Sequence, residues 1–199
     1  MERAKIHLSS EEMQLVKNAE WLLTKNKIIE KVYWLFGQLS ERLKTEIEIL
    51  PEEVKATSPK ISKGEKYQDL PYVMLDFPRY FGKEDFFALR TFFWWGNFFS
   101  VTLHLKGKYQ KQFVRLLHQS ASELALYNFR ICIDGEEWDH DMKEECFAPM
   151  PEHSNIRSVA ILTEKDFYKL SSRVAFDQWD EMEEILFRLH LVIYKAIVA

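Results

Sequence analysis

Residues 136–145 have the composition of a metal site. Acidic side chains are dense there, and Asp139, His140 and Asp141 are consecutive. Carboxylate oxygens and imidazole nitrogens are common ligands of divalent metals. The spacing matches neither an HExxH helix nor an EF-hand loop. Two interpretations therefore stand side by side, a solvated acidic loop and a metal centre built on these three residues.

A second set of polar groups lies in an aromatic-rich segment, residues 86–106. Eight of the fourteen residues from Phe86 to Phe99 are Phe or Trp, and Gly96-Asn97 is typical of a two-residue hairpin loop. With that loop Trp95 faces Phe98, and one face of the hairpin is mixed aromatic and polar. The candidate ligand-binding residues on this face are Phe93, Trp95, Phe98, Ser100, Thr102 and His104.

Flat aromatic area beside hydroxyl and imidazole groups suits a small ligand. The structural alternative is that the aromatic side chains are core residues of a sheet that is covered on both sides. A register slip of one residue would exchange the two faces of the hairpin, because side chains alternate along a strand. The ligand hypothesis therefore depends on the register.

Arg90 falls on the apolar face in this register, opposite Leu103. An unpaired guanidinium there would be very costly, so we expect an acidic partner, either Asp76 or Asp134. Alternatively, Arg90 and Arg79 could bind the carboxylate or phosphate of a ligand. We therefore expect replacement of Arg90 either to destabilise the fold or to weaken ligand binding.

Other chemistry has little support in the sequence. The chain contains no Gly-x-Ser-x-Gly elbow, no phosphate-binding loop and no Gly-x-Gly-x-x-Gly among its six glycines, so we expect no cofactor. Cys132 could pair with His104 or His118 as thiol and imidazole, but a small buried cysteine is the simpler interpretation. The two cysteines are not spaced as CxxC, and we expect free thiols.

The elements that must position these residues follow from hydrophobic periodicity and turn signals. A Ser-x-x-Glu cap starts a helix over 9–24, and a longer helix runs from 28 to the residue before Pro51. A strand is predicted at 70–78, the hairpin at 86–95/98–106 and a helix at 108–127. Further strands are predicted at 128–134 and 167–176, and a final helix at 177–197.

These elements predict an α+β fold. Its antiparallel sheet has about four to five strands with the aromatic hairpin at the centre, packed by helices, an N-terminal helical pair and a long C-terminal helix. We expect one domain, 1–199, made of the helical pair 9–50, a loop 51–68 and a sheet-containing body 69–199.

Charge and hydropathy exclude several classes of function. The 27 basic and 31 acidic residues are spread along the chain and form no basic stripe, which disfavours nucleic-acid binding. No apolar stretch approaches the roughly 18 residues that span a bilayer. We therefore expect a cytoplasmic protein without membrane contact.

The sequence favours a binding or protein-interaction protein that uses the aromatic sheet face or an apolar helix surface. Its partner is an unidentified protein or small molecule, or a second copy of the chain in a homodimer, because the helical stripes offer more apolar surface than one sheet face needs. One alternative is a metal-dependent hydrolase or nuclease-like enzyme using the loop 136–145. The other is single-stranded nucleic-acid binding on the aromatic hairpin. The residues do not decide between enzyme and non-enzyme.

Overall fold

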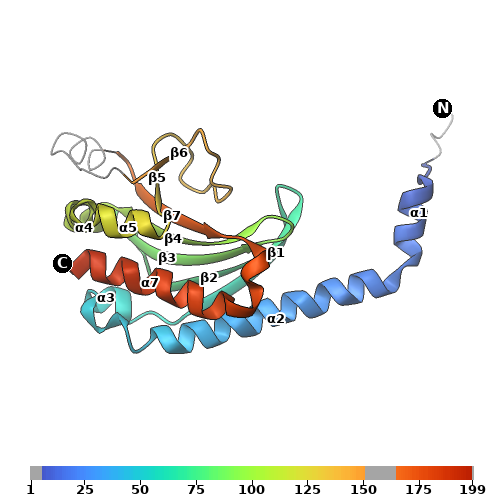
Figure 1. The fold of residues 1–199 in the computed structure, drawn as a ribbon, viewed down its shortest axis with the longest axis horizontal. Helices are drawn as coiled ribbons and strands as arrows, with labels where there is room; N and C mark the ends of the chain where they lie inside the picture. Colours follow the sequence, from blue (N-terminus) through green and yellow to red (C-terminus); the bar gives the residue numbers. More distant parts are fainter. Residues whose placement is uncertain (1–5, 151–164, 199) are drawn as a thin grey trace.

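The computed structural model describes residues 6–150 and 165–198. Its helical elements are α1 (Ser10–Lys17), α2 (Ala19–Leu43), the 3-10 turn η1 (Ile47–Ile49), α3 (Glu52–Lys55), α4 (Lys108–Gln119), α5 (Ala121–Leu126), the 3-10 segment η2 (Phe176–Glu181) and α7 (Met182–Val198). Its strands are β1 (Lys60–Tyr67), β2 (Leu70–Phe81), β3 (Phe86–Trp94), β4 (Phe98–Lys106), β5 (Arg130–Cys132), β6 (Phe147–Pro149) and β7 (Tyr168–Val174). The fold is α+β, as the sequence predicts (Figure 1).

The strands of the described residues form one antiparallel sheet in the order β1-β2-β3-β4-β7-β5-β6. The prediction of four to five strands is too low. The expected loop 51–68 contains α3 and the edge strand β1, so the sheet begins at Lys60 rather than after residue 68. β1 is rich in lysine and largely solvent-facing, which suits an edge strand but hides the alternation that marks a strand in sequence. β6 was missed because it has only three residues.

The register predicted for the β3–β4 hairpin is wrong by one residue. Phe98 pairs with Trp94 rather than Trp95, so the loop has three residues, Trp95 to Asn97. Within it the Asn97 N–H donates to the Trp94 carbonyl at 3.0 Å, and Gly96 has a φ of 74°. A two-residue type I′ loop needs positive φ at both central residues, whereas this turn needs it only at Gly96.

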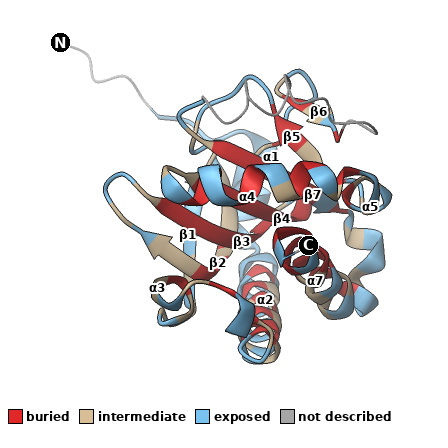
Figure 2. Ribbon diagram, turned by 90° about the vertical axis from the view of Figure 1, so that its left-hand side faces the viewer, coloured by how far each residue is buried: buried red, intermediate tan, exposed pale blue. Residues whose placement is uncertain are grey.

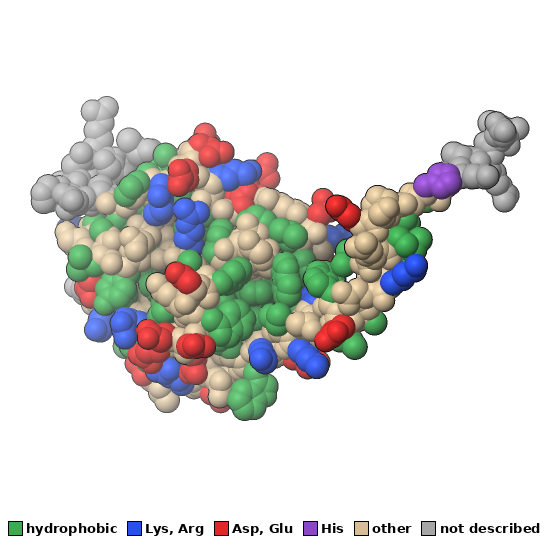
Figure 3. All heavy atoms as spheres, turned by 45° about the vertical axis from the view of Figure 1, so that its right-hand side comes forward, with side chains coloured by type: hydrophobic (Ala, Val, Ile, Leu, Met, Phe, Trp, Pro, Cys, Tyr) green, Lys and Arg blue, Asp and Glu red, His purple; other side chains and the backbone are tan. Residues whose placement is uncertain are grey.

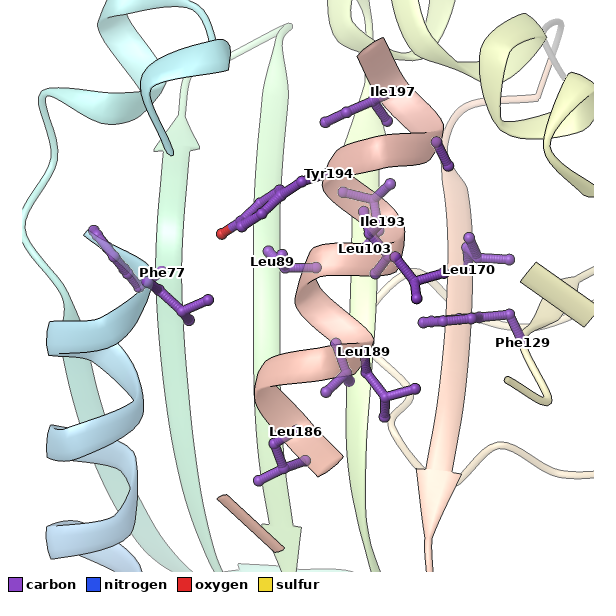
Figure 4. Close-up of a cluster of buried hydrophobic side chains, with 14 of the residues drawn as sticks. Phe77, Leu89, Leu103, Phe129, Leu170, Leu186, Leu189, Ile193, Tyr194 and Ile197 are labelled. Atoms are coloured by element: carbon purple, nitrogen blue, oxygen red, sulfur yellow. The ribbon is translucent and has the colours of Figure 1, made fainter. Parts of the chain in front are cut away.

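The helices that contact the sheet cover one of its faces, here called the helix face. β3 and β4 contribute Phe87, Leu89, Leu103 and Leu105 to this face, and all four are fully buried. Figure 4 shows α7 lying over the sheet along the direction of the strands, with Leu186, Leu189, Ile193 and Ile197 spaced along the helix and Leu89, Leu103 and Leu170 in a row across the strands. Figure 2 shows that β3 and β4 are buried along most of their length. This layer is the main hydrophobic core.

One polar contact lies inside that core. His190 of α7 is 0% exposed, and its Nδ1–H donates to the Leu186 carbonyl at 2.8 Å. Nε2 is then the acceptor for the Thr91 hydroxyl of β3, at 3.2 Å. Burial lowers the pKa of His190 to about 4, so the ring is neutral at pH 7. The pair fixes how α7 sits on the sheet.

The N-terminal helices differ from the prediction in where they meet. The break is at Asn18, not near Lys25 and Asn26, because the Asn18 side chain accepts from the Trp21 N–H and caps α2. The buried stripe of α2 then runs from Lys25 to Leu43. α1 and the first turns of α2 extend beyond the sheet, away from the rest of the molecule (Figure 1). We call residues 6–24 the arm.

Candidate functional site

The second face of the sheet is covered by residues 133–146, which connect β5 to β6 and are here called the strap. Trp138 of the strap packs against Phe86 and His104, and His140 packs against Phe92. Because side chains alternate along β3 and β4, this face carries the residues that the helix face does not. It holds most of the polar groups singled out in the sequence.

Arg90 is the centre of a buried ion pair on this face. Its Nε donates to Asp76 Oδ1 at 2.6 Å and its Nη2 to Asp76 Oδ2 at 3.2 Å, across the β2–β3 pairing. The third nitrogen, Nη1, donates to His140 Nε2 of the strap at 3.2 Å. The pairing of Arg90 with Asp76 is therefore confirmed. The residue opposite Arg90 on β4 is Thr102 rather than Leu103, because the register is shifted by one residue.

His104 and Lys169 form the next row across the sheet. They are cross-strand neighbours on β4 and β7, and each is 2% exposed. The Lys169 ammonium donates to the carbonyl oxygens of Glu137 and Asp139 in the strap. His104 Nε2 lies 3.3 Å from Glu137 Oε1, although the two atoms do not form a hydrogen bond. The same carboxylate accepts from Lys106 Nζ at 3.1 Å.

The electrostatics of this layer keep both histidines neutral. Burial, with Lys169 and Arg90 nearby, lowers the pKa of His104 to about 2. Burial and Arg90 lower the pKa of His140 to about 3. Burial also lowers the pKa of Lys169, and Arg90 adds to this effect. A neutral His140 can accept from Arg90, so its protonation state and its hydrogen bond agree.

The structure divides the predicted ligand-binding residues between two faces. Phe93 lies on the helix face against Phe99, Phe176 and Trp179, and the half-buried Trp95 packs on Phe93. The strap face holds the remainder: Phe98, Ser100, Thr102, His104, Arg90 and Asp76. The strap face is mixed aromatic and polar, but its β3 aromatics are Phe92 and Trp94 rather than the expected Phe93 and Trp95, because the register of β4 against β3 is shifted by one residue.

The strap does not bring its three candidate metal ligands together. His140 faces Arg90, a cation, while Asp141 Oδ2 accepts from Gln68 Nε2 at 2.8 Å and lies 3.2 Å from Lys143 Nζ. The Asp139 carbonyl is bound by Lys169. Among the described residues, no three His, Cys, Asp or Glu side chains are placed to hold a metal ion.

The strap-covered layer thus combines the Arg90–Asp76 ion pair, a lysine bound by carbonyl oxygens of the strap, and two neutral imidazole rings. Asp76, Arg90, His104 and Lys169 are each at most 7% exposed, so a substrate cannot reach them without movement of the strap. Cys132 is also buried, and burial raises the pKa of its thiol, which disfavours the reactive thiolate. The geometry of this layer supports a structural role better than catalysis.

The arm presents a contrasting surface. Of the fifteen large apolar side chains that are exposed among the described residues, eight lie between residues 6 and 23. They are Ile6, Leu8, Met13, Leu15, Val16, Trp21, Leu22 and Leu23. α1 buries none of its side chains against the described part of the chain, although a capping box between Ser9 and Glu12 defines its start. Figure 3 shows apolar side chains on the arm and on the hollowed surface beside it.

The apolar surface continues along α2 beyond the arm. Trp34 is 73% exposed and stands between two open grooves of about 560 and 780 Å³. The first groove is shared with Trp179, and the second with Tyr33 and Lys63. The face of α2 that packs on the sheet continues toward the N-terminus into the arm. Ile29, Lys25 and Leu22 follow one another on this face at helical spacing, and only Leu22 is exposed. Sequence periodicity predicts the apolar stripe of this helix only from residue 28 onward and does not show which part of it is covered.

In comparisons with known proteins, no family model, no curated protein and no solved structure matches the chain. No helix in residues 6–150 and 165–198 is both long and apolar enough to cross a bilayer. The site geometry alone therefore carries the functional argument.

Proposed function

We propose that this chain is a protein-interaction protein and that the arm is its binding surface. The observation that carries the proposal is the concentration of exposed apolar side chains on a projecting helical segment, eight of fifteen within residues 6–23. Clusters of exposed apolar side chains on soluble proteins commonly mark interaction sites, whereas single exposed ones need no explanation. The homodimer expected from the sequence is one form that this interaction can take.

The alternatives have less support in the geometry. The aromatic side chains of β3 are buried along the whole strand, which leaves no open platform for stacked bases. The metal hypothesis needs Asp139, His140 and Asp141 to converge, and their contacts lead to Arg90, Gln68 and Lys169 instead. An apolar helix surface, by contrast, is open to a partner without any rearrangement of the fold.

Site-specific photo-crosslinking tests the proposal for the whole chain in its native cell. A photoreactive amino acid replaces Val16, 72% exposed on α1, and in a control chain it replaces Leu126, 81% exposed on α5. The expected result is a discrete crosslinked protein from position 16 that is absent from position 126 and disappears when Leu22→Glu is added. Equal patterns from both positions, or no crosslink from position 16, would overturn the proposal.

A further inference from the structure

Charge is unevenly distributed along the N-terminal helices. Glu11 and Glu12 stand in the first turn of α1, while Lys27 and Lys31 are exposed on α2 just beyond the arm. Two apolar blocks lie between these charges, residues 13–16 on α1 and 21–23 at the start of α2. From Glu11 to Lys27 the order is acidic, apolar, apolar, basic, with one charge of each sign, Lys17 and Glu20, between the two apolar blocks.

This order is complementary to itself when two copies run antiparallel. The acidic start of one α1 then faces the lysines of the other α2, and each apolar block faces the other block. A two-fold axis repeats every contact, so each favourable pair occurs twice. In Figure 1 the arm extends clear of the sheet and its helices, so its surface is open to a second copy.

The arm also needs a partner on energetic grounds. α1 has eight residues and buries none of them against the described chain. Isolated helices shorter than about 12–15 residues are marginal in water, and tertiary packing of an apolar face normally stabilises them. The eight exposed side chains are the apolar surface that a partner can cover, and a stable interface buries about 800 Å² on each side.

We propose that the arm binds the arm of a second copy of this chain, each α1 packing antiparallel against the first turns of the partner's α2. This inference rests on the proposed function and names its partner. Glu11 of one copy faces Lys27 of the other. Leu15 and Leu23, which lie four residues from Glu11 and Lys27 on the same helix faces, form the apolar centre. A lipid surface fits less well, because Glu11, Glu12 and Glu20 outnumber Lys17 on the arm and would be repelled by anionic headgroups.

Sedimentation velocity of the purified full chain over a micromolar concentration series tests this inference. The expected result is a concentration-dependent dimer. Leu15→Glu places a charge in the apolar centre and is expected to raise the dissociation constant at least tenfold, whereas Leu126→Glu, the matched exposed control, leaves it unchanged. A chain that is monomeric throughout, or a dimer that tolerates Leu15→Glu, would overturn the inference.

Charge reversal separates pairing between copies from contacts within one copy. Glu11 is the residue to change, because Glu12 closes the capping box with Ser9. Glu11→Lys and Lys27→Glu each convert two attractive pairs per dimer into repulsive ones, which is expected to weaken the dimer about fivefold. An equimolar mixture of these two variants restores both pairs and is expected to dimerise like the wild type. Restoration in the double variant but not in the mixture would place the contact within one copy and overturn the inference.

The two proposals fail in different ways. If position 16 crosslinks to a different protein and the purified chain is monomeric, the arm is a binding surface but its partner is not a second copy. If position 16 crosslinks to nothing and the chain is monomeric, both proposals are wrong.

Discussion

Arg90 and Asp76 show what one buried pair does at the residue scale. Their side chains are 9% and 6% exposed. Arg90 supplies a fork of N–H donors, and Asp76 supplies the two carboxylate oxygens that accept from it. His140 completes the guanidinium's partners from the strap. The pair therefore links β2, β3 and the strap through one side chain.

Replacing one partner of this ion pair is expected to lower the free energy of unfolding far more than replacing both partners. Arg90→Met leaves a buried carboxylate unpaired, and we expect a loss of about 3–5 kcal/mol in the free energy of unfolding. Arg90→Met with Asp76→Leu is expected to cost less than the sum of the single changes. Urea denaturation of the four chains measures the coupling. The exposed pair Lys44–Glu41 is the control, where Lys44→Met should cost less than about 1 kcal/mol.

The neutral histidines predict how stability changes with pH. The folded pKa values of His104 and His140 are about 2 and 3, below the unfolded value of about 6.5, so the unfolded state binds more protons in acid. Their stabilisation is complete above pH 6.5 and is lost as the pH falls from there toward 3. Between pH 7 and 5.5 each histidine is expected to contribute a loss of about 1 kcal/mol.

Chemical denaturation at both pH values checks this expectation. His104→Gln cannot take up a proton on unfolding, so the difference between pH 7 and 5.5 should shrink by about 1 kcal/mol. A variant that keeps the full wild-type difference would show that His104 does not contribute to it.

At the scale of elements, the β3–β4 turn and helix α2 offer two glycines that differ in one respect. A Cβ added at Gly96 or at Gly37 would meet nothing within 4 Å, but only Gly96 has positive φ, at 74°. Backbone conformation, rather than packing, therefore distinguishes the two positions.

Alanine at the two positions should have opposite effects on stability. Gly96→Ala forces a side chain into the left-handed region and is expected to destabilise by about 1–2 kcal/mol. Gly37→Ala, inside α2, is expected to stabilise by about 0.5–1 kcal/mol, because alanine loses less backbone freedom in a helix. Thermal and urea unfolding measure both. The same sign of change at both positions would contradict the turn geometry.

At the scale of the whole molecule, the chain combines a packed body with an arm that contributes little to it. Lys25, paired with Glu65 of β1, marks where α2 begins to pack on the body. Beyond this residue the buried stripe includes Val32, Phe36 and Leu39, each 0% exposed. The division predicts that the body folds without the arm.

A chain that begins at Lys25, and so lacks the arm, tests this division. Because residues 6–24 are all exposed, the truncation is expected to change the monomer's free energy of unfolding by less than about 1 kcal/mol. Leu39→Ala on the same helix α2 is expected to cost about 2–5 kcal/mol. Both are measured at concentrations too low for association. Loss of cooperative unfolding in the truncated chain would show that the arm belongs to the core.

Sequence reasoning located the strongly periodic elements of this protein. The stripes of α2 and α7, the positions of β3 and β4, and the need of Arg90 for an acidic partner all follow from local pattern and from the cost of burying charge. β1 was hidden by its lysines, and β6 by its length. The edge of a sheet and a three-residue pairing have weak local signals, since neighbouring strands rather than propensity define them.

The α+β class, the main helices and the polar residues of β3 and β4 follow from local sequence pattern. Which of those residues share a face depends on how the strands pair, because a change of one residue in the turn reverses the alternation of β4 against β3. The strap's cover over the polar face and the exposure of the arm likewise appear only in the folded chain. Burial depends on contacts between segments far apart in the chain, and local periodicity carries no information about which apolar stripe finds a partner.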